Sequence, residues 1–189
     1  MTSASLDLDD CRRCRSCDLA QTRQEVVVSR GNPEARLMLI GEAPGAREDA
    51  TGLPFVGRSG QALDRLLVEV GLSPDQDCYI CNAVKCRPPG NRRPRRSELE
   101  ACRQWLDHQL ALIDPEVIVL AGATALEAVL GSKGRMTDLR GRWQRWEGRD
   151  VMPIFHPSYL LRNPSTADGA PVALTRLDLI AVRQRLCER

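Results

Sequence analysis

The sequence predicts an α/β fold, in which a parallel sheet of four strands carries helices on both faces. Two observations support this prediction. Short, unbroken apolar runs such as Leu37–Ile40 are typical of strands that are buried on both faces. Between these runs, apolar residues recur at helical spacing, so strands and helices alternate along the chain. With 189 residues, 42% of them hydrophobic, we expect a single domain over residues 1–189.

The composition points away from membrane-spanning and secreted proteins. No run approaches the roughly 18 apolar residues of a membrane span, and residues 1–10 lack the apolar core of a signal peptide. We therefore expect a cytoplasmic protein with no membrane partner. We also expect a monomer, and a loosely ordered segment over residues 1–10. In a reducing compartment, eight cysteines favour a metal or cluster site over disulfides.

The cysteines begin with Cys11-x-x-Cys14-x-x-Cys17, a spacing that lets neighbouring thiolates converge on one ion or cluster. Further ligands would come from the later cysteines, which are Cys78, Cys81, Cys86, Cys102 and Cys187. The alternative is a set of small buried thiols that bind nothing. The spacing favours a metal site, and it is compatible both with zinc and with an iron–sulfur cluster.

The first strand, Leu37–Ile40, runs into the turn GEAPG at residues 41–45. Ligands of open α/β sheets bind outside the carboxyl ends of the strands, so Glu42 in this turn is a functional candidate. Phe55 lies in a second loop, which leads into a helix. Together, these two residues suit a flat ligand, on which the aromatic ring can stack and which the carboxylate can polarise.

Residues 59–71 have the apolar stripe of an amphipathic helix, and a second strand follows over residues 78–84. Asn82 lies near the exit of that strand. An asparagine in an apolar strand is disfavoured by propensity, and it is costly if it is buried without partners. Either its side chain fixes a neighbouring loop, or its adjacent donor and acceptor read the edge of a base.

Residues 85–96, with the sequence KCRPPGNRRPRR, hold six basic residues and no acid. Such a run is usually a solvated face. Here prolines stiffen it, no acid offsets it, and it leaves the same sheet edge as Glu42, so we expect it to contact a phosphate backbone. Ser97 is the expected N-cap of the next helix, which ends at Asp114-Pro115.

The third strand is predicted over residues 116–121, and a short helix follows it. Residues 140–148 are expected to form a small hairpin, whose second arm, residues 150–155, supplies the fourth strand. A last amphipathic helix is expected over residues 174–186.

His156 ends the fourth strand beside a rigid proline, where it has either a structural or a catalytic role. Beyond it, Leu160, Leu161 and Arg162 are expected to form an exposed apolar tip with a cation, which suits a wedge into a base stack.

Four residues lie at or just past the carboxyl ends of separate predicted strands: Glu42, Asn82, Gly122 and His156. Because the carboxyl ends of parallel strands meet at one edge of a sheet, we expect one shared pocket there.

Four segments together resemble the family 4 iron–sulfur uracil-DNA glycosylases of the uracil-DNA glycosylase superfamily. They are GEAPG (41–45), PFVGRSG (54–60), CNAVKCRPPGNR (81–92) and FHPSYLLRNP (155–164). The resemblance extends from about Cys14 to the last helix. It implies a three-layer α/β/α sandwich, hydrolysis of the N-glycosidic bond of uracil in DNA as a step of DNA repair, and a 4Fe–4S cluster.

The resemblance also implies roles for individual residues. Phe55 would stack on the flipped uracil, Asn82 would pair with its ring NH and 4-oxygen, and His156 would face its 2-oxygen. Glu42 would be the catalytic carboxylate, and Glu48 would be a second acid whose share in handling the water stays open. The other implied residues are Gly41 and Gly45 at the substrate, Arg87, Arg92, Arg93, Leu160, Leu161 and Arg162 at the DNA, and Cys14, Cys17, Cys86 and Cys102 at the cluster.

Three alternatives compete with this interpretation. A branch of the superfamily that captures uracil-DNA covalently uses an extra histidine in a basic loop, and the corresponding stretch here contains none. The family 5 relatives accept broader base damage, but they usually lack an acid corresponding to Glu42. A non-catalytic iron–sulfur protein that binds DNA or senses redox state would explain the cysteines and arginines, but it would leave the convergence of the strand-end residues unexplained.

Overall fold

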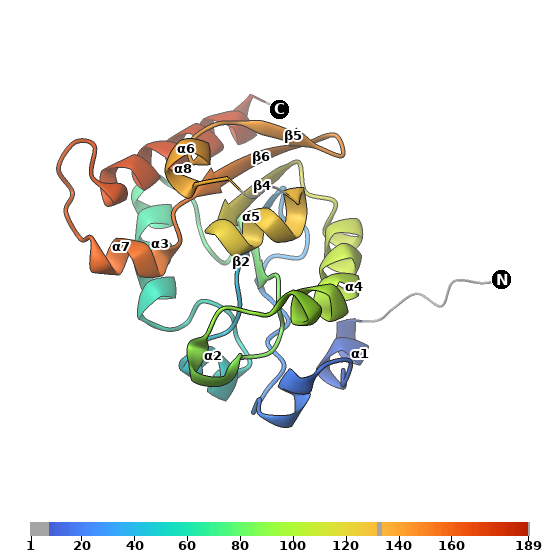
Figure 1. The fold of residues 1–189 in the computed structure, drawn as a ribbon. Coiled ribbons are helices and arrows are strands. Elements are labelled where there is room, and N and C mark those ends of the chain that lie inside the picture. The colour runs from blue at the N-terminus through green and yellow to red at the C-terminus, as the bar shows by residue number, and fades with distance from the viewer. Residues whose placement is uncertain (1–7, 132–133, 189) are drawn as a thin grey trace.

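The computed structural model describes residues 8–131 and 134–188 (Figure 1). Its strands form one six-stranded sheet, with the order β1 (Arg30–Gly31), β3 (Cys78–Asn82), β2 (Leu37–Gly41), β4 (Val117–Ala121), β6 (Arg149–Ile154) and β5 (Gln144–Trp146). The four inner strands pair in parallel, whereas β1 and β5 pair antiparallel with their neighbours. The predicted parallel sheet of four strands is therefore confirmed, and a short antiparallel strand extends it on each side.

The register of the inner strands brings their carboxyl ends to one edge. Leu37 in β2 pairs with Cys78 in β3 and with Val117 in β4, so these three strands begin level with one another. At the other end, Ala121 in β4 pairs with Ile154 in β6. All residues of β2, β3 and β4 are buried, which explains why their sequences are almost continuously apolar.

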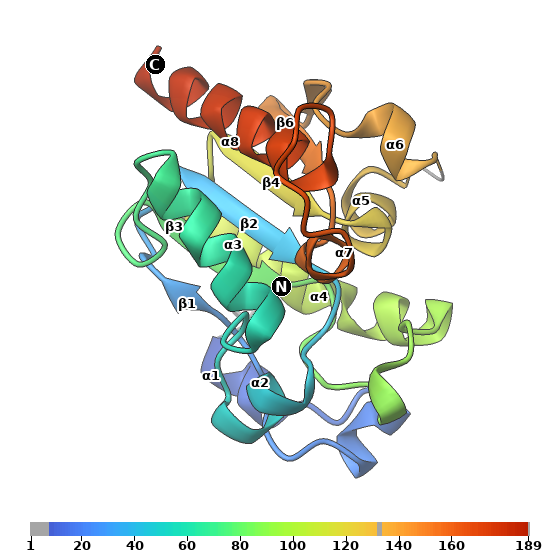
Figure 2. The same ribbon diagram turned by 90° about the vertical axis from the view of Figure 1, so that its left-hand side faces the viewer.

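One face of the sheet is covered by α3 (Arg58–Glu69), α7 (Pro157–Arg162) and α8 (Pro171–Cys187) (Figure 2). The core between these helices and the sheet includes alternate strand residues such as Leu39 and Val119. These three helices form one outer layer of the sandwich.

The opposite face is covered by α4 (Arg96–Ile113) and α5 (Ala123–Leu130), which pack against the other strand residues, among them Ile40 and Leu120. The short helix α6 (Met136–Leu139) contacts β6. The structure therefore has the expected α/β/α layers.

A third, smaller core joins the N-terminal segment to the start of α4. It contains Cys11, Leu19, Val26, Val28, Val84, Cys86, Cys102 and Trp105. The segment contributes α1 (Leu8–Arg12) and a 3-10 helix (Asp18–Gln21). Of the residues expected to be loosely ordered, 8–10 lie in α1, and 1–7 lie outside the described residues.

Two helices begin earlier than the sequence predicts. Arg95 rather than Ser97 is the N-cap of α4, because the Glu98 carboxylate accepts a hydrogen bond from the Arg95 backbone N–H at 2.7 Å and closes the first turn. α8 begins at Pro171, a residue that fits the first turn of a helix. Within the described ranges, no helix is long and apolar enough to cross a membrane.

Candidate functional site

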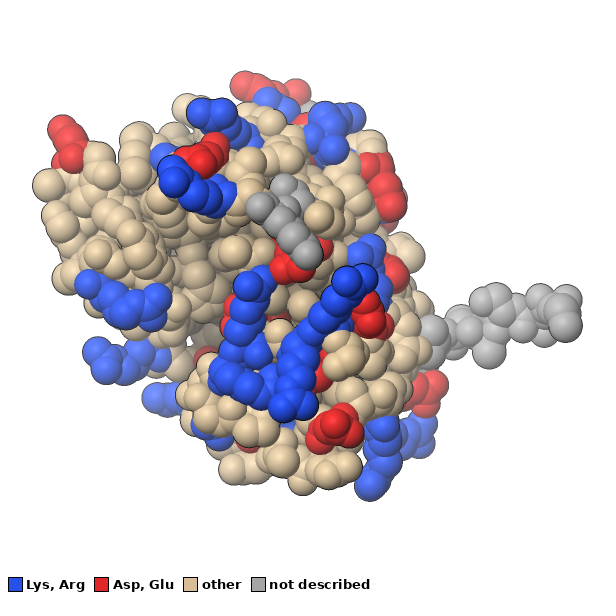
Figure 3. All heavy atoms as spheres, viewed as in Figure 1, with Lys and Arg blue, Asp and Glu red and all other residues tan. Residues whose placement is uncertain are grey.

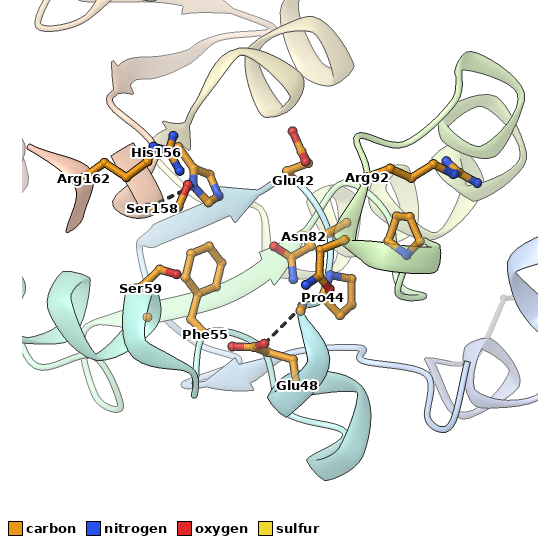
Figure 4. Close-up of a pocket in the computed structure, with 15 residues that line it drawn as sticks. Glu42, Pro44, Glu48, Phe55, Ser59, Asn82, Arg92, His156, Ser158 and Arg162 are labelled. Carbon is orange, nitrogen blue, oxygen red and sulfur yellow. Dashed lines mark hydrogen bonds between the residues drawn. The ribbon is translucent and has the colours of Figure 1, made fainter. Parts of the chain in front are cut away.

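A cavity of about 350 Å³ lies at the carboxyl edge of the parallel strands (Figure 4). Glu42 follows β2, Asn82 ends β3, and His156 follows β6, and all three line the cavity together with Phe55. The other predicted residues in its wall are Gly45, Glu48, Arg92 and Arg162. The expected shared pocket at the strand ends is therefore present, and three of the four predicted strand-end residues line it, whereas Gly122 does not.

Two glycines create the space in which Phe55 sits. A Cβ atom on Gly41 would lie 2.3 Å from the Phe55 ring and 2.5 Å from Asn82 Oδ1. A Cβ atom on Gly60 would lie 1.9 Å from the Phe55 carbonyl oxygen. Phe55 itself has a positive φ of 56° and a ring that is buried at the cavity wall. Gly41 thus lets the ring and the amide approach each other beneath the cavity.

The side-chain amide of Asn82 is the clearest unused polar group in the site. Asn82 is only 2% exposed, and its main-chain oxygen accepts a hydrogen bond from Lys85 Nζ at 2.5 Å. Its side-chain amide has no hydrogen-bond partner among the described residues. Among the described residues, Arg149 Nε is the one fully buried side-chain nitrogen or oxygen without a partner, so the Asn82 amide reaches the open cavity. This amide therefore presents a donor and an acceptor to a ligand in the cavity.

His156 is the N-cap of α7 and is held by Ser158. The His156 Nδ1 atom accepts a hydrogen bond from the Ser158 backbone N–H at 3.2 Å and lies 2.7 Å from Ser158 Oγ. Burial lowers the pKa of His156 below its usual value, and it outweighs the opposing effect of Glu42. The ring is therefore neutral at pH 7 and carries its proton on Nε2. Gly122 lies behind the ring, where a Cβ atom would come within 2.9 Å of His156 Cβ.

The two acids in the cavity wall have different surroundings. Glu42 Oε2 accepts a hydrogen bond from Thr124 Oγ1, on the first turn of α5. Both oxygens of Glu48 accept backbone hydrogen bonds, from Gly57 at 2.7 Å and from Gly45 at 3.1 Å. Glu48 therefore ties the turn after β2 to the loop before α3. The Oε1 atom of Glu42 has no partner in the part of the chain that the structure describes.

Sequence reasoning missed two hydroxyl groups that contact the site residues. Thr124 contacts Glu42, and Ser158 contacts His156. Each lies two positions after a strand-end residue that the sequence does single out, namely Gly122 and His156. A hydroxyl residue two positions after a strand-end residue is therefore the feature of the sequence that could have pointed to them.

The basic loop, residues 85–96, is paired with acids from neighbouring helices. Arg92 makes two hydrogen bonds to Glu98, at 2.6 and 2.9 Å, and Arg93 makes one to Glu127 at 2.7 Å. The expectation that no acid offsets this loop is therefore wrong, because α4 and α5 supply carboxylates from outside the run. Basic side chains nevertheless gather over the loop at the surface (Figure 3).

The apolar tip beyond His156 is smaller than expected. Leu160 is only 3% exposed, so the prediction that it belongs to an exposed tip is wrong. In α7, Pro157 and Leu160 lie one turn apart and face the core, which leaves Leu161 exposed and Arg162 at the cavity. The predicted DNA-contacting residues outside the cavity wall are Arg87, Arg93, Leu160 and Leu161.

A second, small cavity is lined by the four predicted cluster cysteines, Cys14, Cys17, Cys86 and Cys102, together with Cys11. Over residues 8–131 and 134–188, no three His, Cys, Asp or Glu side chains are arranged to hold a single metal ion. A 4Fe–4S cluster takes one thiolate at each of four irons, so its ligands stand farther apart than those of one ion. The remaining cysteines, Cys78, Cys81 and Cys187, lie elsewhere.

Hydrogen-bond donors face the sulfur atoms of this cavity. Trp105 Nε1 lies 3.2 Å from Cys14 Sγ, and an Arg23 guanidinium nitrogen lies 3.5 Å from Cys86 Sγ. Burial raises the pKa of Cys14, but hydrogen bonds from Ser16 and Trp105 outweigh it, and the net pKa is below the usual value. At Cys14 the donors therefore favour a thiolate, whereas burial raises the pKa of Cys86 to about 12 and also raises the pKa of Cys102.

Comparison with known proteins agrees with this geometry. Residues 28–179 match the family model of the uracil DNA glycosylase superfamily. A type-4 uracil-DNA glycosylase of Thermotoga maritima is 49% identical over 156 residues, which are 82% of this chain and 81% of the relative. The type-4 enzyme of Saccharolobus solfataricus is 38% identical over 173 residues, or 87% and 80% of the two chains.

A type-5 uracil-DNA glycosylase of Thermus thermophilus is 43% identical over a shorter stretch of 118 residues, 55% of this chain and 53% of the relative. These two type-4 relatives therefore match more of the chain than the type-5 relative does. The chain belongs to the uracil DNA glycosylase superfamily and, within it, to the type-4 uracil-DNA glycosylases.

Proposed function

We propose that this protein is a DNA repair enzyme that flips uracil out of DNA and hydrolyses its N-glycosidic bond, leaving an abasic site and free uracil. The observation that carries this proposal is the unpaired Asn82 amide beside the Phe55 ring in the cavity. We also propose a single-domain monomer as the active form.

Recognition of the flipped base follows from these two side chains. Extruding a nucleotide costs a few kcal/mol of stacking and pairing, which contacts in the pocket must offset. Phe55 would stack on the base, and the Asn82 amide would pair with the ring NH and the 4-oxygen of uracil. Cytosine presents a donor and an acceptor in the reverse order, so the same amide would reject it.

The leaving group would be stabilised by His156. Cleavage of the N-glycosidic bond places negative charge on the departing uracil. A neutral imidazole with its proton on Nε2 can donate to the 2-oxygen, and such a donor is worth about 3–4 kcal/mol in the transition state. Protonation of His156 is not needed, in agreement with its lowered pKa.

Glu42 would act on the other side of the bond. Its Oε1 atom would orient the attacking water or stabilise the positive charge that develops on the sugar. Glu48 would act differently, because both of its oxygens already accept backbone hydrogen bonds. We assign it the role of a positioning residue that fixes the Phe55 loop.

Cys14, Cys17, Cys86 and Cys102 would hold the 4Fe–4S cluster. The donors at the sulfurs suit any metal-bound thiolate, and the lack of a single-ion site among the described residues supports a cluster over zinc. When bound, the cluster would cross-link the N-terminal segment, the basic loop and α4. It would thereby position the loop that contacts DNA.

A cleavage assay on an end-labelled oligonucleotide with one uracil tests the proposal, with thymine and hypoxanthine oligonucleotides as controls. We expect an abasic site at uracil alone. Cleavage at hypoxanthine as well would shift the assignment towards a glycosylase of broader specificity. If cluster-loaded protein binds the DNA but cleaves none of the three oligonucleotides, the glycosylase proposal is wrong.

A further inference from the structure

The hydroxyl group of Thr124 lies between the acid of the cavity and the basic loop. We propose that Thr124 is a positioning residue for Glu42, and that Arg93 fixes the direction of the Thr124 hydroxyl proton. This inference rests on the proposed function, because it assigns to Thr124 the task of holding the acid of the glycosylase reaction. It adds a residue outside the cavity wall to the residues that act in the proposed reaction.

The position of Thr124 is set by the exit of β4. Gly122 has a positive φ of 94° and turns the chain into α5, so that Thr124 falls on the first turn of that helix. Thr124 is only 2% exposed. A threonine hydroxyl in a helix commonly bonds a backbone carbonyl of its own helix. The contacts found here are instead to side chains from two other segments.

The two contacts define the direction of the hydroxyl proton. Arg93 Nε lies 3.2 Å from Thr124 Oγ1, and a guanidinium can only donate. An ionised Glu42 carboxylate can only accept, so the single hydroxyl proton points to Glu42 Oε2. One carboxylate oxygen is thereby held, and the other, Oε1, is left for the water or the sugar.

Arg93 is itself held in place. Its second contact is to Glu127 Oε2 at 2.7 Å, and Glu127 lies one helical turn after Thr124 on α5. The guanidinium group thus bridges two α5 residues while its side chain stays 58% exposed at the surface. The basic loop and the acid are therefore connected through a single hydroxyl group.

The effect of Thr124 on the cleavage rate can be measured separately from its effect on DNA binding. Without the hydroxyl, Glu42 loses a charge-assisted hydrogen bond, and its carboxylate can rotate. Thr124→Val keeps the shape of the side chain but removes the hydroxyl, whereas Thr124→Ser keeps the hydroxyl. We expect Thr124→Val to lower the single-turnover cleavage rate by about 10- to 100-fold, since a hydrogen bond to a charged group has about that effect. The Kd for uracil-containing DNA should stay within about twofold.

The experiment compares single-turnover rates and Kd values for the wild type, Thr124→Val, Thr124→Ser, Glu42→Ala and the double variant Glu42→Ala/Thr124→Val. Thr124→Ser should recover most of the rate, and the double variant should be no slower than Glu42→Ala, because Thr124 acts through Glu42. Thr175→Val is the matched control, since this fully buried threonine bonds the Pro171 carbonyl oxygen in α8 at 2.8 Å, away from the site.

Three outcomes would overturn the inference: a wild-type rate in Thr124→Val, a Thr124→Ser variant as slow as Thr124→Val, or losses that multiply in the double variant. Thermal melts identify a variant that has lost its fold, and the serine variant still tests the role of the hydroxyl in that case. Failure of the proposed function looks different, because the wild type would then not cleave uracil-containing DNA, or Glu42→Ala would cleave as fast as the wild type.

Discussion

The two cavities of this protein are built in different ways. The cavity at the sheet edge collects polar groups from rigid strand ends, and the described residues leave both the Asn82 amide and Glu42 Oε1 without partners. The cysteine cavity is assembled from helices and loops far apart in the sequence, and donors of the chain itself face its sulfurs. The first arrangement suits a ligand that comes and goes, and the second suits a group that stays.

This comparison predicts that damage to the first cavity lowers the reaction rate and damage to the second lowers the stability. The largest effect is expected for His156→Ala, which removes the proposed donor to the leaving base. The single-turnover rate on uracil-containing DNA should fall about 10²- to 10³-fold. The Kd for the DNA should change little, and the melting temperature should fall by only a few degrees, because His156 is also the N-cap of α7. A variant that cleaves at the wild-type rate would remove His156 from the mechanism.

The matching change in the second cavity is Cys86→Ser. Because metal binding is coupled to folding, loss of one ligand should destabilise the protein by about 4 kcal/mol or more. For a chain of this size, that corresponds to a fall in Tm of about 8–16 °C. Visible absorbance of the cluster and thermal melts measure the effect. Cys187→Ser is the control, since Cys187 is exposed and far from the cavity, and equal behaviour of the two variants would contradict the assignment.

Gly41→Ala tests how closely the first cavity is fitted. The new Cβ would overlap the Phe55 ring and the Asn82 amide, so one of the two groups must move. We expect a loss of stability of about 1–3 kcal/mol from overpacking and a clear fall in kcat/KM for uracil-containing DNA. Denaturant unfolding and steady-state kinetics measure the two effects. An unchanged kcat/KM would show that the position of Phe55 and Asn82 does not limit recognition.

Glu48→Gln and Glu42→Gln form a matched pair within the first cavity. Glu48→Gln replaces an acceptor oxygen by a donor group opposite a backbone N–H, which should cost about 1 kcal/mol of stability. Its cleavage rate should stay within about threefold of the wild type. Glu42→Gln should show the opposite pattern, with a slower rate and similar stability. If Glu48→Gln is the slower enzyme, the roles of the two acids must be exchanged.

The smallest effect concerns pH. The pKa of His156 is lower in the folded state than its usual value of 6.5, so the unfolded chain binds more protons below that pH. The resulting contribution to stability is present above pH 6.5 and is lost as the pH falls towards the folded pKa. Between pH 7 and pH 5.5, the Tm should therefore fall less in His156→Gln than in the wild type. Parallel Tm profiles would contradict the burial argument.

The sequence could predict what depends on local pattern. The strands around Leu39 and Val119 are recognisable because burial on both faces requires unbroken apolar runs, and the residues that end them fall at one sheet edge in any parallel arrangement. For this reason Glu42, Asn82 and His156 could be placed together before the structure was known.

Two kinds of feature could not be predicted: those that depend on the rotation of a helix about its axis, and side-chain contacts between residues far apart in the sequence. Leu160 is buried because α7 is oriented with Pro157 and Leu160 towards the core. The position of Leu160 in the sequence does not determine this orientation. The partners of the arginines, Glu98 and Glu127, lie in α4 and α5, and the contact of Thr124 with Glu42 spans 82 positions of the sequence. Such pairings follow from the packing of helices against the sheet.

The long separation of the proposed cysteine ligands also has a consequence during protein synthesis. The hydrogen bond from Trp105 to Cys14 joins residues 91 positions apart. At translation rates of 5–20 residues per second, the ribosome needs roughly 5–20 s to make the chain between them. Cys14 therefore emerges from the ribosome earlier than Trp105 by about this interval, before the helix that will cover the thiols has emerged. If these thiols hold the proposed cluster, oxidants and factors that deliver iron and sulfide can reach them at this stage.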